Sequence, residues 1–269
     1  MLSSGNVNPE SSGGQAGASR KAEGPSVLRD PAYLDVTYST QVAPRGAYPD
    51  CLGRWLLDHA FRRPGRLLDV GCGRGDYLDV FSRLGFAVAG VDISPRAAEL
   101  APSAEVRVAD LETEPMPFPP SSFDFVFSKS VVEHLRQPGG VFPKILDVLK
   151  PGGVAVIMTP SWEHNSWGPF YIDHTHVTPF TILSLADLFQ TTGFEAVEVS
   201  YFRQLPFLWR FRFLAPLVWL LARLPLPYRP YHPSAPWPDG FNKLVRFSKE
   251  VMILGIARKP LPGAQKESA

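Results

Sequence analysis

The chain has 269 residues, 45% of them hydrophobic and 20% charged, and its formal net charge is +1. This length fits one α/β domain with attachments better than two independent domains, and the hydrophobic content predicts that most of the chain folds. The balanced charge and the lack of a long basic run disfavour nucleic acid as a partner. We therefore expect one main domain that binds no DNA or RNA.

The first 24 residues are rich in serine, glycine, asparagine and alanine and contain little that can be buried. A disordered tail is predicted there, without the apolar centre of a secretory signal. The chain has two cysteines, Cys51 and Cys72, and Cys72 lies in a glycine-rich loop where a disulfide would obstruct a ligand. This cysteine usage predicts a reducing, cytoplasmic setting.

Short apolar runs alternate with helical patterns after a lead-in over residues 25–64, which includes an expected helix at 50–61. The expected strands are 67–70, 87–91, 105–108, 123–128 and 152–159, and the expected helices between them are 76–84, 95–100 and 141–149. This alternation predicts an α/β fold: a Rossmann-like, doubly wound sheet, mostly parallel, with helices on both faces.

The alternation breaks after a helix expected at 179–191 and a strand at 196–201. Residues 202–248 are rich in proline and aromatic residues, and only then do residues 251–258 supply a last strand. We interpret the last two strands as an antiparallel pair whose connection is enlarged into an apolar helical cap. The expected organisation is a core of residues 65–201 and 249–260, a cap of residues 202–248 and a tail of residues 261–269.

The stretch LLDVGCGRGDYLDV, residues 67–80, places a glycine-rich turn between the first strand and a helix. Glycine lets a ligand approach the backbone, and a helix start attracts nucleotide-like ligands. The spacing of Gly71, Gly73 and Gly75 departs from the dinucleotide fingerprint, which weakens an NAD interpretation. Asp69 and Asp92, near the ends of successive strands, are suited to accept hydrogen bonds from a cationic amino group and from ribose hydroxyls, respectively. S-adenosylmethionine carries both groups.

Each of these features also has a purely structural interpretation. The glycine loop can be an ordinary tight turn, Asp92 a helix cap ahead of Ser94 and Pro95, and Asp110 a turn residue. Cys72 is interpreted as a small packing residue, because no neighbouring histidine or lysine would activate its thiol.

Four stretches in order resemble the class I S-adenosylmethionine-dependent methyltransferases: LLDVGCGRGDYL, VAGVDISP, VADLETEPMPFPPSSFDFVFSKSVVEHL and VLKPGGVAVIMTP. The resemblance spans residues 67–258 and implies S-adenosylmethionine as the cofactor. The cofactor-binding residues that it implies are Asp69, Gly71, Cys72, Gly73, Gly75, Asp92, Ile93, Asp110, Leu111 and Ser128. By this resemblance the glycine loop cradles the methionine part, and Ser128 and Lys129 border the transfer site.

The resemblance also divides the remaining residues among parts of the cofactor. Asp92 holds the ribose, Ile93 packs on the adenine, and Asp110 with Leu111 meets the adenine edge. The crevice rule for open parallel sheets independently places a ligand at these strand ends.

Methyl transfer to a hydroxyl requires an aligned acceptor and the removal of its proton, so a base is expected near the strand ends. The stretch YIDHTHVTPFTILSLADLFQTTGF, residues 171–194, supplies His174 and His176 just before a helix. Either histidine is a candidate general base, and either can instead hydrogen-bond a turn. Glu133 and His134 resemble a family motif and are interpreted as structural or as lying at the pocket edge.

No metal ion is predicted, although one alternative stays open. The residues Glu163, His164, Asp173, His174 and His176 offer ligand types that a divalent ion accepts. No compact spacing enforces such a site.

Residues 205–228 are the most apolar part of the chain, interrupted by Arg210, Arg212 and Arg223. The uninterrupted part, residues 213–222, is far shorter than the roughly 20 apolar residues that a bilayer crossing needs. Four interpretations stay open: a lid over an apolar acceptor, an interfacial membrane contact, a dimer surface, or a helix buried on the core.

Together these patterns predict a cytoplasmic S-adenosylmethionine-dependent methyltransferase, with peripheral membrane contact through residues 205–228 as one option. The leading hypothesis is O-methylation of a hydroxyl on a small, glycan or lipid-linked acceptor. C- or O-methylation of a quinone-like ring is the alternative among enzymes. A non-catalytic protein that binds the cofactor and a partner protein is the alternative from another class.

Overall fold

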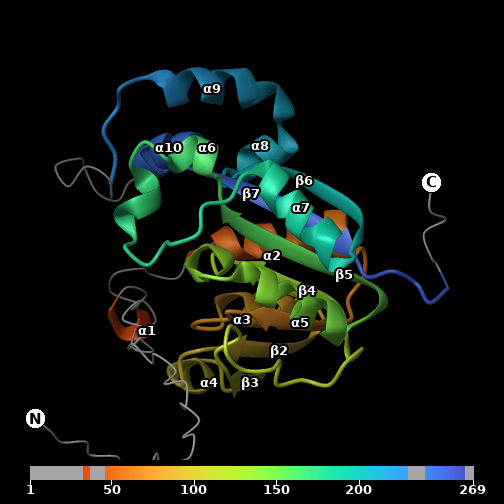
Figure 1. Ribbon diagram of the computed structural model, residues 1–269. Coiled ribbons are helices and arrows are strands. Elements are labelled where there is room, and N and C mark those ends of the chain that lie inside the picture. Colours follow the sequence, from red (N-terminus) through yellow and green to blue (C-terminus); the bar gives the residue numbers. More distant parts are fainter. Residues whose placement is uncertain (1–32, 37–45, 230–239, 264–269) are drawn as a thin grey trace, which may run out of the picture.

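The computed structural model describes residues 33–36, 46–229 and 240–263, and the tail predicted at residues 1–24 lies outside these ranges. The described residues form a seven-stranded sheet with helices on both faces (Figure 1). The strand order is β3-β2-β1-β4-β5-β7-β6, and β7 runs antiparallel to both of its neighbours. The predicted Rossmann-like sheet with an antiparallel last strand is confirmed.

The strands are β1 (Arg66–Val70), β2 (Ala87–Asp92), β3 (Glu105–Val108), β4 (Phe123–Lys129), β5 (Leu149–Pro160), β6 (Glu195–Arg203) and β7 (Val251–Arg258). The α-helices of at least five residues are α2 (Tyr48–Leu56), α3 (Asp76–Arg83), α4 (Arg96–Leu100), α5 (Phe142–Val148), α7 (Ile182–Thr192), α8 (Pro206–Arg210), α9 (Ala215–Arg223) and α10 (Gly240–Lys249). The short helical segments are α1 (Tyr33–Val36), η1 (Leu57–Phe61), η2 (Val132–His134), η3 (Pro138–Gly140), α6 (Trp162–Asn165), η4 (Pro169–Ile172) and η5 (Arg212–Leu214).

The fifth strand begins earlier than predicted. The sequence placed its start at Gly152, but Leu149 already pairs with Phe123, and the register shifts directly after this pair. Gly152 has a φ of +75°. A Cβ added at Gly153 would lie 2.8 Å from the carbonyl oxygen of Lys150. The Pro-Gly-Gly turn is therefore an irregularity inside the strand and not its boundary.

Alternating side chains of the central strands supply two hydrophobic layers. In β1, Leu67 packs in the layer with α2, η1 and α3, whereas Leu68 and Val70 pack in the layer with α5 and α7. All three side chains are buried. A parallel strand buried on both faces is apolar without interruption, which is why its sequence is a short apolar run.

Helix α7 leads the chain from the site into β6. The Thr181 hydroxyl accepts a hydrogen bond from the Ser184 N–H, and the Ser184 hydroxyl accepts one from the Thr181 N–H. This capping box sets the helix start at Ile182, three residues after the predicted one. The helix ends at Gly193, whose φ of +100° suits glycine.

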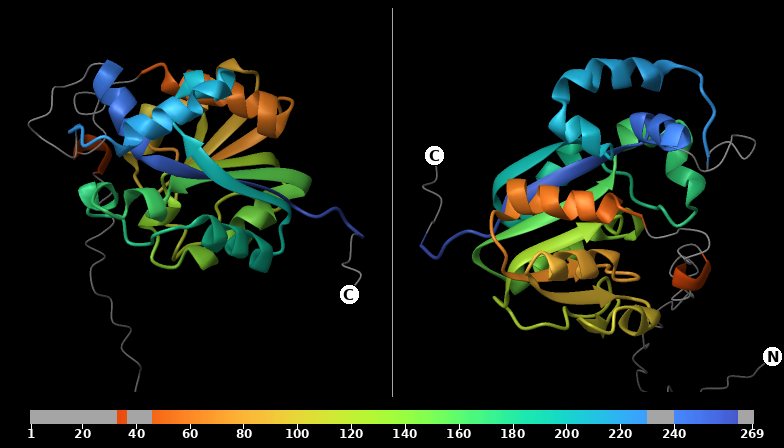
Figure 2. Two further views of the ribbon diagram at one scale, coloured as in Figure 1. Left: turned by 90° about the horizontal axis from the view of Figure 1, so that it is seen from above. Right: turned by 180° about the vertical axis from the view of Figure 1, so that it is seen from behind.

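The connection between β6 and β7 folds into a cap with a small core of its own. Leu205, Leu208 and Val218 pack there with Leu244 and Phe247 of α10. Helix α9 packs on α10 and lies farther from the sheet than α10 does (Figures 1 and 2). Within the described ranges, no helix combines the length and apolar character needed to cross a membrane.

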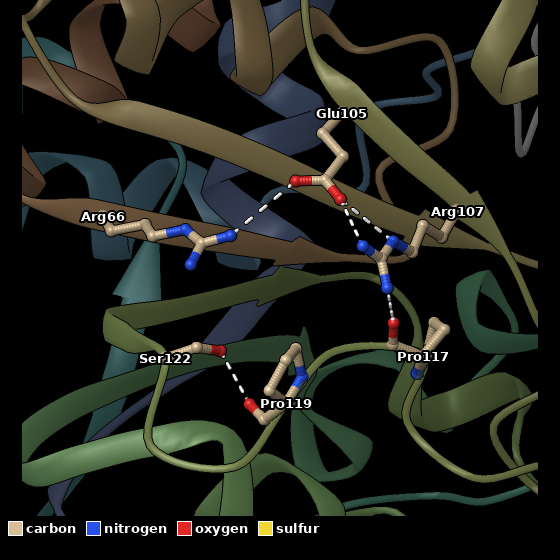
Figure 3. A network of polar contacts seen from close by, with 6 residues as sticks. All are labelled: Arg66, Glu105, Arg107, Pro117, Pro119 and Ser122. Atoms are coloured by element: carbon tan, nitrogen blue, oxygen red, sulfur yellow. Dashed lines mark hydrogen bonds and ion pairs between the residues drawn. The ribbon is translucent and has the colours of Figure 1, made fainter.

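Exposed charged side chains pair at the amino ends of the strands (Figure 3). Glu105 accepts hydrogen bonds from Arg107 at 2.5 and 3.0 Å, and it lies 3.7 Å from the guanidinium of Arg66. Arg107 also donates to the carbonyl of Pro117. The charges at this edge of the sheet are thus solvated and paired with one another.

Candidate functional site

The glycine loop follows β1 at the carboxyl edge of the sheet. Gly71, Gly73 and Gly75 have φ angles of +76°, +52° and +77°, a region that favours glycine. A Cβ at Gly71 would lie 2.2 Å from the side chain of Val131, and one at Gly75 would lie 2.6 Å from Ala101. Backbone conformation and close packing both require glycine here, which argues against an ordinary turn open to other residues.

Asp92 joins the glycine loop to the loop after β2. Its carboxylate accepts hydrogen bonds from the N–H groups of Gly73 and Ser94, both at 2.8 Å. Helix α4 has Pro95 at its N-cap and no side-chain cap, so Asp92 is not the helix cap that the sequence left open. Burial raises the pKa of Asp92, while these hydrogen bonds act to lower it.

Tyr33 of α1 also binds this carboxylate. Its hydroxyl lies 3.2 and 2.9 Å from the two oxygens of Asp92. The neighbouring Leu34 is buried against Leu78 and Ala101 beside the glycine loop. A ribose bound by Asp92 therefore has to share the carboxylate with this phenol or displace it.

Asp69 lies beneath the loop with one oxygen that has no partner. Its side chain is 2% exposed, and its Oδ2 accepts no hydrogen bond. Burial, followed by the nearby Asp92 and Asp76, raises the pKa of Asp69 well above its usual range. A buried carboxylate beside other acids is costly unless a cation neutralises it. The site therefore fits the ammonium group of the methionine part of S-adenosylmethionine.

Two further predicted residues make contacts inside the fold. Cys72 is buried beside Leu78, and burial raises the pKa of its thiol, which agrees with a packing role. The hydroxyl of Ser128 donates to the carbonyl of Val70 at 2.9 Å and so links the ends of β4 and β1.

The residues predicted to meet the adenine lie in the loops after β2 and β3. Asp110 accepts a hydrogen bond from the N–H of Glu112 at 3.0 Å, which closes a turn. Leu111 is buried in the core, and Ile93 is half-buried after β2. Contact of these residues with a cofactor stays a prediction.

A second group of polar side chains lies where β4 and β5 end. Glu133 and His134 of η2 and His176 each offer one ligand atom, and these atoms all lie within 4.8 Å of one another. The two histidine rings are 4.7 Å apart between centroids. His174 is exposed. The structure thus joins one predicted histidine to two residues that the sequence analysis left outside the catalytic set.

Backbone hydrogen bonds hold these two segments together. The N–H groups of Val177 and Thr178 donate to the carbonyl of Glu133 at 2.9 and 3.0 Å. The Thr178 hydroxyl donates to the carbonyl of Leu135. The segment that carries His176 is therefore fixed onto η2, although some forty residues separate the two in the chain.

Hydrogen bonds also define the protonation of both rings. His176 Nδ1 lies 2.6 Å from the carbonyl oxygen of Phe170, which can only accept, so Nδ1 carries the proton. The Thr175 hydroxyl donates to Asp173 at 2.5 Å, so its oxygen accepts from His134 Nδ1 at 2.8 Å. In the neutral form of both rings Nε2 keeps its lone pair.

Burial disfavours charge throughout this group. Glu133 is 0% exposed; its Oε2 accepts from the Thr159 hydroxyl at 2.9 Å, and its Oε1 has no partner. Burial raises the pKa of Glu133 to about 7 and lowers the pKa of His134 to about 4. Burial likewise lowers the pKa of Lys129 to about 8 and that of His176 below its usual value.

The alternative metal site considered from the sequence does not form as a unit. Glu163 and His164 contact Ser161, Asp173 contacts Thr175, and His174 is exposed. Across the described part of the chain, the group of potential ligands that gathers is Glu133, His134 and His176. The Glu-His pair was visible in the sequence, but only the fold shows which histidine joins it.

Residues 47–199, more than half of the chain, match the family described as methyltransferase domain. The chain belongs to this family, and its sheet order and glycine loop are those of the class I S-adenosylmethionine-dependent methyltransferases.

Curated relatives match over part of their length. An uncharacterised methyltransferase from Mycobacterium tuberculosis is 34% identical over 150 residues, which cover 53% of this chain and 54% of the relative. A ubiquinone biosynthesis O-methyltransferase from Bradyrhizobium is 36% identical over 104 residues, or 35% of this chain and 39% of the relative. The chain thus spans about half the length of the curated relatives it matches.

Solved structures share the fold at low sequence identity. A Haloferax volcanii methyltransferase structure, a complex with the Trm112 activator, has a TM-score of 0.62 at 17% identity and covers 86% of this chain and 97% of that one. Phosphoethanolamine N-methyltransferase 2 of Haemonchus contortus, in complex with S-adenosyl-L-methionine, has a TM-score of 0.55 at 21% identity and covers 85% and 59%. At such identities the likeness concerns the fold alone.

Proposed function

We propose that the protein transfers a methyl group from S-adenosylmethionine to a hydroxyl of a small, glycan or lipid-linked acceptor. The observation that carries the proposal is the contact between the two halves of the site. A Cβ at Gly71 would strike Val131, which lies two residues before Glu133. A cofactor-type loop and a group of neutral imidazoles therefore adjoin at one edge of the sheet.

The chain's own residues divide the work between the two halves. Asp69 supports binding of the ammonium group and Asp92 supports binding of the ribose. When bound, S-adenosylmethionine supplies a methyl group already activated on a positively charged sulfur. The protein then has to hold the acceptor in line and to promote the loss of its proton.

His176 is the residue that we propose for promoting proton loss. Its Nδ1 is held by the Phe170 carbonyl, so the lone pair that can take a proton is on Nε2, and its ring offers a ligand atom within 4.8 Å of those of Glu133 and His134. His174, the other histidine predicted from the sequence, is exposed and lies outside this group.

The test replaces each histidine by glutamine and measures turnover and cofactor affinity separately. His176→Gln should leave S-adenosylmethionine affinity intact and lower turnover by about 10² to 10⁴. His174→Gln is the matched comparison on the same loop. A loss confined to His174→Gln would move the role to that residue, and no loss in either variant would leave acceptor alignment alone to run the reaction.

The acceptor is found by incubating the full chain with labelled S-adenosylmethionine and pooled cell extracts, followed by mass analysis of the labelled products. A methylated hydroxyl supports the proposal. A methylated quinone-like ring would favour the alternative chemistry. Cofactor binding without any labelled product would favour the non-catalytic partner protein instead.

We further propose that the cap meets a lipid surface, as a peripheral contact of a cytoplasmic enzyme. Its exposed apolar side chains include Phe207, Phe211, Phe213, Leu217, Trp219 and Leu220, with Arg210, Arg212 and Arg223 exposed among them. Arg223 lies over the ring of Trp219, 3.1 Å from its centroid. Exposed aromatics beside arginines suit an interface with anionic headgroups, and a lipid-linked acceptor would be presented there.

Trp209, which lies in the same segment, does not belong to this exposed surface. Its ring packs on Trp55 and Phe202, and its N–H donates to the carbonyl of Arg203 at 2.9 Å. This tryptophan fastens the cap to the sheet and is not available for acyl chains.

The membrane contact is tested by flotation with anionic phosphatidylglycerol vesicles. The triple variant Phe213→Ser, Leu217→Ser and Leu220→Ser should lose flotation, because these side chains are 76%, 63% and 54% exposed. Leu183→Ser, at a position of α7 that is 80% exposed, is the matched control. Equal flotation of the triple variant and the unmodified chain would leave the cap as packing only.

A further inference from the structure

We infer that Glu133, His134 and His176 bind a divalent transition-metal ion at the acceptor end of the site. One carboxylate oxygen and two imidazole nitrogens lie within 4.8 Å of one another, a spacing that a single ion can bridge. They come from η2 and from the loop after η4, which backbone hydrogen bonds fasten together. The ligand set is therefore built into the fold before any ion arrives.

The unpartnered oxygen of Glu133 is an independent pointer to a cation. Its side chain is fully buried, and Oε1 accepts no hydrogen bond from any neighbour, Lys129 included. The ammonium of Lys129 instead lies 3.5 Å from the hydroxyl of Ser130. A buried carboxylate oxygen without a partner is costly, and a bound cation would supply the missing interaction.

Contacts behind the three ligands orient them in the way metal sites require. The Phe170 carbonyl fixes His176, and the chain from Thr175 to Asp173 fixes His134, each through Nδ1. Metal-binding histidines characteristically donate their other N–H to a carbonyl, a carboxylate or a similar group. In both rings the nitrogen left with a lone pair is Nε2.

The ligand types narrow the choice of ion. Two imidazole nitrogens with one carboxylate oxygen suit Zn²⁺, Fe²⁺ or Co²⁺, whereas Mg²⁺ and Ca²⁺ prefer oxygen ligands throughout. Three protein ligands leave at least one coordination position open. We expect Zn²⁺ to bind, with Co²⁺ as its spectroscopic substitute.

The open position has a use if the proposed methyl transfer is correct. An acceptor hydroxyl bound there would have a lower pKa and would lose its proton to solvent water, because the imidazole of His176, as a metal ligand, has no lone pair left to accept it. This role rests on the proposed function. Metal binding itself does not, because it depends only on the three ligands and the contacts behind them.

The test uses the full chain, stripped of metal with a chelator and dialysed. Zn²⁺ titration followed by calorimetry and Co²⁺ titration followed by visible absorption should each saturate at one ion per chain. Glu133→Gln and His176→Gln should each weaken binding at least about tenfold, and Thr175→Val should weaken it by about tenfold because it releases the ring of His134. Thermal melts of each variant establish that the fold is kept.

His174→Gln is the matched control for metal binding, because His174 lies two residues from His176, is exposed and is outside the ligand group. Its affinity for Zn²⁺ should equal that of the unmodified chain. The inference is overturned if the unmodified chain binds neither Zn²⁺ nor Co²⁺ saturably. It is also overturned if the His176→Gln variant binds Zn²⁺ as tightly as the unmodified chain.

Affinity for S-adenosylmethionine, measured on the same samples, keeps the two proposals distinguishable. If the chain binds S-adenosylmethionine but no metal ion, the metal site is refuted and the proposed function is unaffected. Saturable Co²⁺ binding in a chain that binds no cofactor would do the reverse.

Discussion

Two buried carboxylates at the carboxyl edge of the sheet each keep one oxygen without a hydrogen-bond partner, yet their surroundings differ. Asp69 lies near two other acids, Asp76 and Asp92, which raise its pKa further after burial. Glu133 lies beside two imidazoles whose Nε2 lone pairs are uncommitted. The first arrangement attracts an organic cation, and the second offers a coordination shell.

This contrast matches the different needs of the two proposed ligands. An ammonium group needs negative charge and acceptors, which a cluster of acids supplies without further shaping. A metal ion needs deprotonated nitrogen and oxygen atoms that converge on one point. The hydrogen bonds that orient the ligating side chains therefore have to hold each of them in the correct direction. The five predictions that follow test the acidic side of the comparison against other parts of the sheet, from the largest expected effect to the smallest.

Asp69→Asn should weaken S-adenosylmethionine binding by about 1.5 to 3 kcal/mol, because the ammonium group loses its charged acceptor. The same substitution should stabilise the unliganded fold, since it removes a buried charge that has no counter-ion. Calorimetry measures the affinity and thermal melting the stability. Asp58→Asn, at an exposed position of η1, is the control and should change neither.

The gain in stability from Asp69→Asn should depend on pH with a defined sign. The folded pKa of Asp69 lies above its unfolded value of about 3.9, so its favourable contribution is complete below that pH and is lost as pH rises through the folded pKa. The difference in melting temperature between variant and unmodified chain should therefore grow from acid to neutral pH. A difference that is constant with pH would contradict the assignment of this buried charge.

Asp92→Ala should weaken S-adenosylmethionine binding by about 1 to 3 kcal/mol, measured by calorimetry, because ribose hydroxyls lose a charged acceptor. It also releases the N–H groups of Gly73 and Ser94, so Asp92→Asn, which keeps an acceptor oxygen, separates the two effects. Unchanged affinity in Asp92→Ala would refute the ribose assignment.

Tyr33→Phe should act in the opposite direction and tighten S-adenosylmethionine binding by up to about tenfold, the worth of one hydrogen bond. The phenol hydroxyl lies near both oxygens of Asp92, and phenylalanine keeps the ring that packs on the cluster with Leu34 while removing the competing donor. Weaker binding would instead mean that Tyr33 and the ribose share the carboxylate.

Glu105→Gln, at the opposite edge of the sheet, should have the smallest effect, about 0 to 1 kcal/mol of stability and none on cofactor affinity. Its partners Arg66 and Arg107 are exposed, so water replaces the lost interaction. Denaturant unfolding measures the first quantity and calorimetry the second. A large loss of affinity would show that the two edges of the sheet are coupled.

The sequence by itself determined the parts of this protein that depend on neighbouring residues. These parts include the apolar runs that become β1, β2 and β4 and the loop from Gly71 to Gly75. They can be recognised within a few residues, because a buried strand selects apolar side chains and a positive φ angle selects glycine. Asp69 and Asp92 could be predicted as cofactor-binding residues for the same reason, since Asp69 lies one residue before the end of β1 and Asp92 is the last residue of β2. The family resemblance then extended these local patterns into a fold.

Only the tertiary structure decided which distant groups meet. Nothing local to His174 and His176 distinguishes them, and it is the hydrogen bonds from Val177 and Thr178 to Glu133 that bring His176 to the group and leave His174 exposed. Tyr33 reaches Asp92 across 59 positions of the chain in the same way. Such contacts form because distant segments of the chain end at the same edge of the sheet. Residue type and spacing along the sequence do not show which segments these are.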